Sequence, residues 1–596
     1  MSGFGMAEDE VRRPMNSVVD LEIIQQVAQK DLIALFQKCQ GDKAIVWDRA
    51  LANPMNLIAT PKVLKEHGVV RMIQLDSGMA LPPDIPETVL FICRPLVQLM
   101  PVVASCVRTE EKNRRRRKFH LIFIPRTSKL CEKYLEEQGV RLSLESIDDL
   151  PIFLFPLDKD VLTLELDPVF KEFHADMDPT GMHNIARALV SLQKRFGTPS
   201  KVFGKGAAAS YVYSLMQNLK QESGSIKPQI SGVGMDYMIL IDRQIDPLSP
   251  LVTQLTYEGL IDEFFGISNN QVKLPEEKFG ETKTIFLSSG EDLYAELRDK
   301  NFSAIGGILR SKTTKIQEKL RQKERGNMSV SEMKQLVQHL PAIQTLKQSL
   351  STHTSIAELI KAKTETDEFL SSLECEQELL SGMGTEKVNS HIENLCGKKA
   401  PLNNVLRLLL IQSITSGGLK ANILQHYQRL IVQNYGFQHV LTLNRLYAMG
   451  LLRLQGGSRY TTLRRALNLT VCDVSEINPT DFAYVHSIYA PLSIRLIQHR
   501  LKPSLWANLK DSLLSLLPGP TVDEDTEIPV GLISGKRSTK FTVVVFIGGC
   551  TFAEISALRF LAQQDDEREF LVVTSKIING NTFLKSLQED ILSVQS

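Results

Sequence analysis

The segment of this sequence that most resembles a catalytic centre lies at residues 236–246. Asp242 closes the apolar run DYMILID, and Asp246 follows four residues later, directly before Pro247. A strand that ends in Asp-x-Asp is typical of aspartyl phosphotransferases, in which the first carboxylate attacks phosphorus and the second transfers protons beside a magnesium ion. Position 244 is glutamine, so the second carboxylate is missing. A phosphate-handling enzyme that uses Asp242 is therefore the alternative hypothesis, not the preferred one.

A structural role explains more of the same segment. Arg243 stands between the two aspartates, and a planar guanidinium can bind a carboxylate through two parallel hydrogen bonds. Pro247 and Pro250 stiffen the turn that follows, and apolar residues then recur with helical spacing between positions 251 and 265. We therefore predict a corner between domains that is held by ion pairs.

Other catalytic or metal-binding patterns are weak. The eight cysteines show no CxxC spacing and the eleven histidines show no HExxH or HxH grouping, so we predict no metal site, no cofactor and no catalytic residues. The turn at Gly548-Gly549 could hold an anion at the start of a helix, but paired glycines more often only tighten a turn. The basic run NRRRRKFH (113–120) could meet anionic lipid or phosphate, although a solvated loop is the preferred interpretation.

Length and charge limit the class of protein. The chain has 596 residues, of which 43% are apolar, and a formal net charge of +1. This length predicts several domains, and the balanced charge argues against a nucleic-acid partner bound over a broad basic face. The first twenty residues lack the apolar core of a secretory signal, and no run reaches the roughly 18 apolar residues of a membrane span. We expect a cytoplasmic protein that associates with membranes indirectly.

Apolar runs of strand length alternate with helical patterns early in the chain, which is typical of parallel sheets covered on both faces. After residue 250 helical periodicity dominates, and buried runs return only near the end. Because one or two strands cannot fold alone, the late strands are expected to complete an earlier sheet. The expected strands lie at 43–48, 69–76, 88–95, 119–125, 151–158, 236–242, 541–549 and 569–576.

The predicted fold is therefore α/β plus α, with two parallel-sheet domains and a largely helical domain inserted into the second. The acidic stretch PGPTVDEDTEIP (518–529) is expected to be an exposed loop. The predicted divisions are a disordered N-terminus at 1–17, a first α/β domain at 18–150, the first part of a second at 151–250, the helical domain at 251–484 and the rest of the second domain at 485–596.

Within the helical domain, QHLPAIQTLKQSL (338–350) places Pro341 inside a helical pattern, where proline removes a hydrogen bond and kinks or interrupts the helix. The flanking segments are long and amphipathic, and STHTS (351–355) is interpreted as a turn. Together they predict a helical hairpin at about 330–382. Its tip could offer a groove to a helix of another protein, or the hairpin could pack internally.

At this point several motifs resemble those of the Sec/Munc-type (SM) family, the regulators of SNARE-mediated membrane fusion. LIDRQIDPLSPLVTQLTYEGLIDE carries the family's Asp-Arg-x-x-Asp, proline turn and Thr-Tyr pattern. YAPLSIRLIQ (489–498) and VFIGGCTFAEISALRFL (545–561) match further elements. TYEGLIDEFFGISNNQVKLPEEKF is most similar to one branch, the A-type class C vacuolar protein-sorting subunit of the HOPS and CORVET tethers. The residues that fill the signature are Asp242, Arg243, Asp246, Thr256 and Tyr257.

The resemblance implies an arch of three domains without enzymatic activity, whose signature residues are structural. It implies that the protein binds SNARE helices at the hairpin and templates their assembly at late endosome, lysosome or vacuole membranes. It also implies docking onto a helical-repeat class C subunit of the tether through a distal part of the helical domain, at about 400–470. The candidate SNARE-binding residues are Leu336, Leu340, Pro341 and Leu346, and the candidate tether-binding residues are Tyr435, Phe437, Val440 and Leu441.

Overall fold

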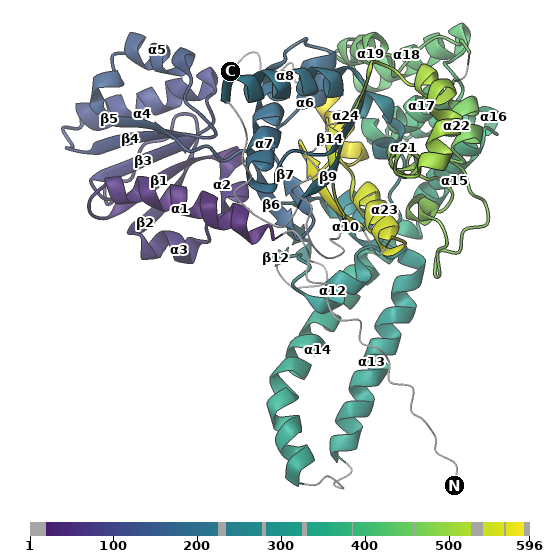
Figure 1. Cartoon of the computed structure of the whole chain (residues 1–596), viewed down its shortest axis with the longest axis horizontal. Coiled ribbons are helices and arrows are strands. Elements are labelled where there is room, and N and C mark those ends of the chain that lie inside the picture. The colour runs from purple at the N-terminus through teal and green to yellow at the C-terminus, as the bar shows by residue number, and fades with distance from the viewer. Residues whose placement is uncertain are drawn as a thin grey trace.

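The protein forms an arch in a computed structural model, with one sheet at the end of the arch, a second sheet at its centre and helices beyond (Figure 1). This arrangement confirms the predicted α/β plus α fold class. The predicted disorder of residues 1–17 lies outside the described residues. The structure describes residues 20–223, 234–276, 282–324, 330–383, 385–457, 459–525, 540–565 and 568–588.

The first unit is a five-stranded parallel sheet with the strand order β2-β1-β3-β4-β5. Its elements are α1 (Glu22–Lys38), β1 (Lys43–Asp48), α2 (Arg49–Asn56), α3 (Pro61–Glu66), β2 (Val69–Leu75), β3 (Thr88–Cys93), η1 (Val97–Leu99), α4 (Met100–Lys112), β4 (Lys118–Phe123), α5 (Lys129–Glu137), η2 (Arg141–Ser143) and β5 (Leu144–Asp149). Helix α1 packs Phe36 against one face with Ile45, while α4 packs Val103 against the other face with Val46. Because both faces are covered, β1 and β3 are buried along their whole length.

The second sheet has seven strands in the order β13-β8-β9-β14-β15-β7-β6. Its elements are β6 (Phe155–Asp158), β7 (Val161–Thr163), α6 (Val169–His174), α7 (Thr180–Phe196), β8 (Lys201–Lys205), α8 (Ala207–Ser223), β9 (Met235–Asp242), η3 (Arg243–Ile245), α9 (Leu248–Leu251), α21 (Leu492–Leu501), α22 (Pro503–Leu516), β13 (Thr521–Asp525), β14 (Lys540–Ile547), α23 (Phe552–Gln563), β15 (Arg568–Thr574) and α24 (Gly580–Leu587). Strand β14 pairs in parallel with β9, Val544 opposite Ile239, so this sheet is built from two distant parts of the chain.

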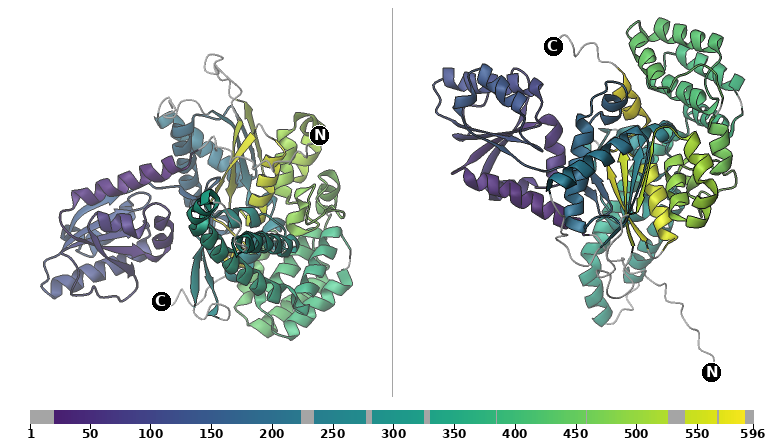
Figure 2. Two further views of the ribbon diagram at one scale, coloured as in Figure 1. Left: turned by 90° about the horizontal axis from the view of Figure 1, so that it is seen from below. Right: turned by 45° about the horizontal axis from the view of Figure 1, so that its top comes forward.

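The intervening segment is largely helical and packs beside the second sheet (Figure 2). Its elements are α10 (Tyr257–Phe265), β10 (Ile267–Ser268), β11 (Gln271–Leu274), β12 (Lys283–Phe286), α12 (Asp292–Leu297), α13 (Phe302–Glu324), α14 (Val330–Thr364), α15 (Asp367–Ser381), α16 (Thr385–Gly397), α17 (Leu402–Thr415), α18 (Ala421–Tyr435), α19 (His439–Ala448), α20 (Arg459–Ala466) and η4 (Phe482–His486). Strands β10, β11 and β12 form a small antiparallel sheet. Most residues of α17 are buried, so this helix lies at the centre of the packed helical layers.

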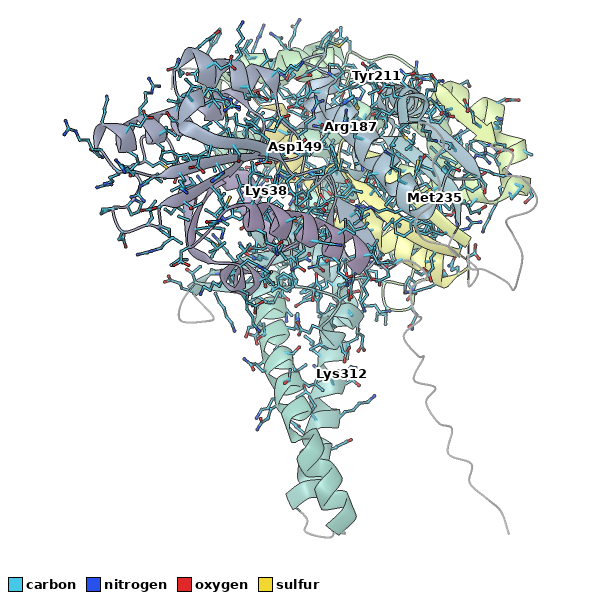
Figure 3. The ribbon with its side chains drawn as sticks, turned by 60° about the vertical axis from the view of Figure 1, so that its left-hand side comes forward. Lys38, Asp149, Arg187, Tyr211, Met235 and Lys312 are labelled. Atoms are coloured by element: carbon cyan, nitrogen blue, oxygen red, sulfur yellow. The ribbon has the colours of Figure 1, made fainter. Side chains whose placement is uncertain are left out.

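The helical hairpin differs from the predicted one. Helix α14 runs without interruption from Val330 to Thr364, so the predicted turn at 351–355 is wrong and Pro341 does not end the helix. The hydroxyls of Thr354 and Ser355 donate to carbonyls four residues earlier, and the helix continues because Leu350, His353 and Ile356 on one face are buried at the hairpin base. The hairpin is formed by α13 and α14, and it projects away from the body beyond Lys312 (Figures 1 and 3).

Two strands rich in acidic residues were not predicted. Strand β5, with the sequence LESIDD, pairs with β4 at an edge of the first sheet, and β13 pairs antiparallel with β8 at an edge of the second. The predicted loop at 518–529 is therefore wrong for Thr521–Asp525, while 526–529 lie outside the described residues. Edge strands need only one buried face and tolerate charged residues, which explains why an apolar pattern was absent.

A network of charged side chains joins the second sheet to the helical insert. The Arg559 guanidinium donates to both carboxylate oxygens of Asp160 at 2.7 and 2.9 Å and to Asp299 at 3.0 Å. Arg298 pairs with Asp158, and the Tyr294 hydroxyl donates to Glu258 at 2.6 Å. Four carboxylates thus share two guanidinium groups in a largely buried site. Burial raises the pKa of Glu258 to about 6 and that of Asp299 to about 7.

These raised pKa values predict that the protein is more stable at pH 6 than at pH 7.5. The folded protein holds the protons of Glu258 and Asp299 more tightly than the unfolded chain, so their contribution is lost as the pH rises through about 6 to 7. We expect Asp299→Asn to reduce the difference in unfolding free energy between pH 6 and pH 7.5 by about 1 kcal/mol. Thermal melting at each pH measures it, with the exposed Asp511→Asn as control. An unchanged slope in Asp299→Asn would contradict the assignment.

Candidate functional site

The turn after β9 contains a fully buried arginine. The Arg243 guanidinium forms two parallel hydrogen bonds with Glu554, from Nη1 to Oε1 at 3.0 Å and from Nη2 to Oε2 at 2.8 Å. It also donates to the carbonyl of Gly549 at 3.1 and 2.6 Å and to that of Asp246 at 2.9 Å. Burial lowers the pKa of the guanidinium, but the carboxylates of Glu554 and Asp246 more than offset this. Arg243 therefore remains a charged group with all its donors satisfied.

Glu554 is held in place by the start of α23. The Thr551 hydroxyl accepts from the Glu554 amide at 3.1 Å, and Glu554 accepts from the Thr551 amide at 3.0 Å, a reciprocal capping box. A side chain at Gly548, whose φ is +99°, would lie 2.9 Å from Cβ of Arg243. The two glycines therefore allow a close approach of the backbone to Arg243 and Ile578, and the Gly549 carbonyl accepts from the Arg243 guanidinium, so this turn does not hold the anion considered as the less frequent option.

The two flanking aspartates do not make the predicted ion pairs with Arg243, because its carboxylate partner is Glu554. Asp246 accepts from the Ser249 amide at 3.0 Å and hydroxyl at 2.6 Å and from the Ser493 amide at 2.9 Å. The Ser493 hydroxyl in turn donates to Glu554 at 2.5 Å. The corner is thus a connected hydrogen-bond network between β9, α21 and α23, and the pairing of Glu554 with Arg243 is the feature that the sequence analysis missed.

The Asp242 carboxylate is likewise hydrogen-bonded within the protein. Its Oδ1 accepts from the Gln244 amide at 2.9 Å and faces Nε2 of His174 at 3.0 Å, and its Oδ2 accepts from the Ala208 amide at 2.8 Å. The side chain is completely buried, and a Cβ at Gly206 would lie only 2.2 Å from that of Asp242. Among the described residues, no group of three or more side chains is placed to hold a metal ion. The geometry therefore gives no support to phosphoryl transfer at Asp242.

The other two signature residues attach the base of the hairpin. Thr256 caps α10, its hydroxyl accepting from the Gly259 amide at 3.2 Å. The buried Tyr257 hydroxyl lies 3.0 Å from Nδ1 of His353, and Nε2 of His353 lies 3.0 Å from Glu291. His353 belongs to α14, so Tyr257 fixes the position of the projecting hairpin relative to the body.

The predicted SNARE-binding residues all belong to α14. The side chains of Leu336, Leu340 and Pro341 lie outside the described residues. Leu346 is half-buried and packs against the apolar cluster at the hairpin base, so it has a packing role there. A polar stripe with helical spacing runs along α14 beside it. Gln344, Lys347, Gln348 and Ser351 are exposed, and Thr352 and Ser355 are half-buried.

The predicted tether-binding residues separate into two kinds. The Tyr435 hydroxyl donates to the Ala400 carbonyl at 2.6 Å and the ring packs against the core. Tyr435 therefore stabilises the fold of the helical insert. Phe437 is 78% exposed and Leu441 47% exposed, and Val440 is half-buried beside them. Tyr447, 49% exposed, lies on the same face of α19 as Val440 because the two are seven residues apart. We call Phe437, Val440, Leu441 and Tyr447 the α19 surface.

The basic run is partly structural. Arg117 is buried, pairs with Glu110 at 2.5 Å, and donates to the backbone carbonyls of Ile85 and Pro86. Arg115 also pairs with Glu110, at 3.1 Å. Two of the four consecutive arginines therefore hold the loop before β4 in place.

Comparison with known proteins agrees with this geometry. The profile of the Sec1 family matches residues 43–586, nearly the whole described chain. The chain belongs to the Sec1 family. It is 42% identical to vacuolar protein sorting-associated protein 33A of Rattus norvegicus over 590 residues, which cover 96% of this chain and 98% of the relative. It is 34% identical to the vacuolar protein-sorting-associated protein 33 homolog of Arabidopsis thaliana, again over 97% of this chain and 98% of that one. The resemblance drawn from the signature motifs is thus confirmed.

Solved structures share the fold at much lower identity. A structure titled SM protein Vps45 in complex with Qa SNARE Tlg2 (1-310) superposes with a TM-score of 0.60 at 17% identity, covering 95% of this chain and 97% of that one. The Unc18–syntaxin 1 complex from Monosiga brevicollis gives a TM-score of 0.60 at 14% identity, covering 95% and 99%. The arch is therefore common to proteins whose sequences have diverged widely.

The Arg243–Glu554 pair predicts a large loss of stability when one partner is removed. Arg243→Ala leaves a buried, unpaired Glu554, which costs about 3 to 5 kcal/mol, and Arg243→Lys loses the two-bond geometry although it keeps the charge. Thermal melting of both variants measures this, with the exposed Arg465→Ala as control. Melting of Arg243→Ala at the wild-type temperature would refute a structural role for the pair.

Proposed function

We propose that this protein is a non-catalytic, SNARE-binding regulator of membrane tethering and fusion at late endosomes, lysosomes or vacuoles, acting as the SM subunit of HOPS or CORVET tethers. The observation that carries this proposal is the full-length match to relatives named for vacuolar protein sorting. The signature carboxylates are buried and accept hydrogen bonds from the protein itself, which supports a scaffold rather than an enzyme. Among the described helices, none is long and apolar enough to cross a membrane, and we propose that partners bring the protein to the membrane.

We place the SNARE contact on the projecting hairpin, at Leu336, Leu340 and Pro341 and along the polar stripe of α14. Helix α14 spans 35 residues, or about 50 Å at the usual rise per residue, and offers one continuous surface to a helix laid beside it. Tyr257 and His353 fix that surface to the body. Two SNARE helices aligned on a fixed surface lose less orientational freedom when they meet, which is how a template assists their assembly.

We place the contact with the helical-repeat class C subunit of the tether on the α19 surface. Phe437, two residues before α19, and Leu441 are large, apolar and exposed, and Val440 and Tyr447 extend the patch along α19. Aromatic and aliphatic side chains of this kind form the centres of protein interfaces. This surface is on the helical insert beyond the second sheet and apart from the hairpin tip, so both partners can bind together (Figure 1).

For the tether contact we expect Phe437→Asp to weaken binding of the helical-repeat subunit by about 30-fold or more, because a hot-spot side chain contributes about 2 kcal/mol or more. Titration calorimetry with the purified subunit measures the affinity. Ile477→Asp, which changes an equally apolar and exposed residue elsewhere, is the matched control and should bind normally. Equal affinities of the two variants for the subunit would show that the α19 surface is not part of the interface.

For the SNARE contact we expect Leu340→Asp to abolish capture of endolysosomal SNARE helices while tether binding persists. A pull-down of wild type, Leu340→Asp and Phe437→Asp against both partners makes each variant the control for the other. Loss of one partner in each variant supports two separate surfaces on one scaffold. If well-folded wild-type protein captures neither partner, the proposed function is wrong.

A further inference from the structure

A cavity lies directly behind the signature turn, between that turn and the helical insert. Its volume is about 240 Å³. The signature turn forms one wall through residues 244–248, and the ends of α17, α19 and α22 and the start of α20 form the others. Most of its lining is apolar, including Leu248, Leu463 and Leu516. A cavity of this composition binds apolar groups in preference to water.

Two arginines line the same cavity without a carboxylate to balance them. Arg453 and Arg459 make no ion pair with any described residue, and both are exposed at the rim. Partial burial of the Arg453 guanidinium at the rim and the neighbouring Arg459 charge lower the pKa of Arg453, and no acidic group counters this effect. The one carboxylate in the lining, Asp246, is already held by Ser249 and Ser493 and lies beside the Arg243 charge. The rim therefore attracts an anion.

Two tyrosine rings complete the wall of the cavity. The Tyr489 ring lines the cavity and is completely buried, and its hydroxyl is close to Ser249 and the backbone of Leu492. The neighbouring Tyr460 hydroxyl is used, since it donates to the Leu380 carbonyl at 2.9 Å. The two tyrosine rings therefore add apolar surface to the wall, and the positively charged side chains of the cavity are those at its rim.

We propose that this cavity binds a small amphiphile, with an apolar tail in the leucine-lined interior and a single carboxylate or phosphate group at Arg453 and Arg459. At about 30 Å³ for a water-sized group, the volume holds roughly eight methylene groups. Arginine is the preferred side chain for both head groups because its donors match their oxygens. Free fatty acids and phosphate-bearing lipids share this chemistry. The inference is independent of the SNARE and tether contacts.

Such a ligand would contact both the second sheet and the helical insert. The turn at Gln244 and Leu248 continues from β9, whereas Arg453 and Arg459 belong to the insert. A molecule bound across this boundary stabilises the folded arrangement by mass action and raises the melting temperature. The cavity would thus couple the rigidity of the arch to the supply of an anionic lipid or lipid fragment.

The test is titration of the full-length protein with octanoate, octyl phosphate and 1-octanol, all below their micellar concentrations, by calorimetry and thermal melting. We expect both anions to bind one per chain and to raise the melting temperature, and 1-octanol to bind at least 10-fold more weakly. The double variant Arg453→Gln, Arg459→Gln should lose at least 10-fold in affinity for the anions. Arg465→Gln, which changes an exposed arginine on the same helix α20, is the matched control and should bind as wild type.

Three results would overturn the proposal: no saturable binding, equal binding of 1-octanol and the anions, or unchanged anion affinity in the double variant. Tighter binding of octyl phosphate would identify phosphate-bearing lipids as the source of the ligand, and tighter binding of octanoate would identify fatty acids. Because the two arginines are at the rim and make no ion pair, their replacement leaves the fold intact. A melting curve without ligand verifies this for each variant.

Discussion

The arch depends on a charge that is completely removed from water. Arg243 and Glu554 are 311 positions apart in the sequence, and each is fully buried. Transfer of two such groups from water costs several kcal/mol each, which their attraction offsets only if every donor and acceptor is satisfied. The structure meets this condition with the Gly549 and Asp246 carbonyls, the Thr551 cap and the Ser493 hydroxyl. Any displacement of β9 against α23 would leave at least one charge unpaired, so the network defines one arrangement of the two chain segments.

This requirement explains why the signature residues lie where no partner could reach them. Asp242, Arg243 and Asp246 are all buried, and they hold the surfaces around them in position without contacting a partner protein. Tyr257 has a similar role nearer the surface, because its hydrogen bond with His353 fixes α14 relative to the core. The proposed contact surfaces, the hairpin and the α19 surface, lie on elements that this core holds at fixed places. A scaffold that aligns helices needs such rigidity more than it needs reactive groups.

Sequence patterns predicted the sheets well where strands are apolar on both faces. KAIVWD and the run around Val544 are buried throughout, and their continuous hydrophobicity is a clear signal. Strands β5 and β13 were missed because edge strands rich in aspartate and glutamate carry no such signal. The turn predicted at 351–355 was wrong because Leu350, His353 and Ile356 are buried with helical spacing, and this packing favours a continuous helix. At the site, Arg243 was recognised but its partner was not, since only tertiary structure brings residue 554 to residue 243, although Thr551-x-x-Glu554 is a recognisable capping box.

The order of strands in the second sheet has a consequence for how the protein is made. Strand β14 lies at the centre of that sheet, between β9 and β15, yet it begins at Lys540, about 300 residues after β9 ends. At ribosomal rates of roughly 5 to 20 residues per second, about 15 to 60 s pass between the synthesis of β9 and that of β14, and one edge of β9 stays unpaired during this time. During that interval the nascent chain presents a long apolar strand edge of the kind that promotes aggregation. Biosynthesis of this protein therefore calls for chaperone protection of the half-built sheet while the helical insert is being translated.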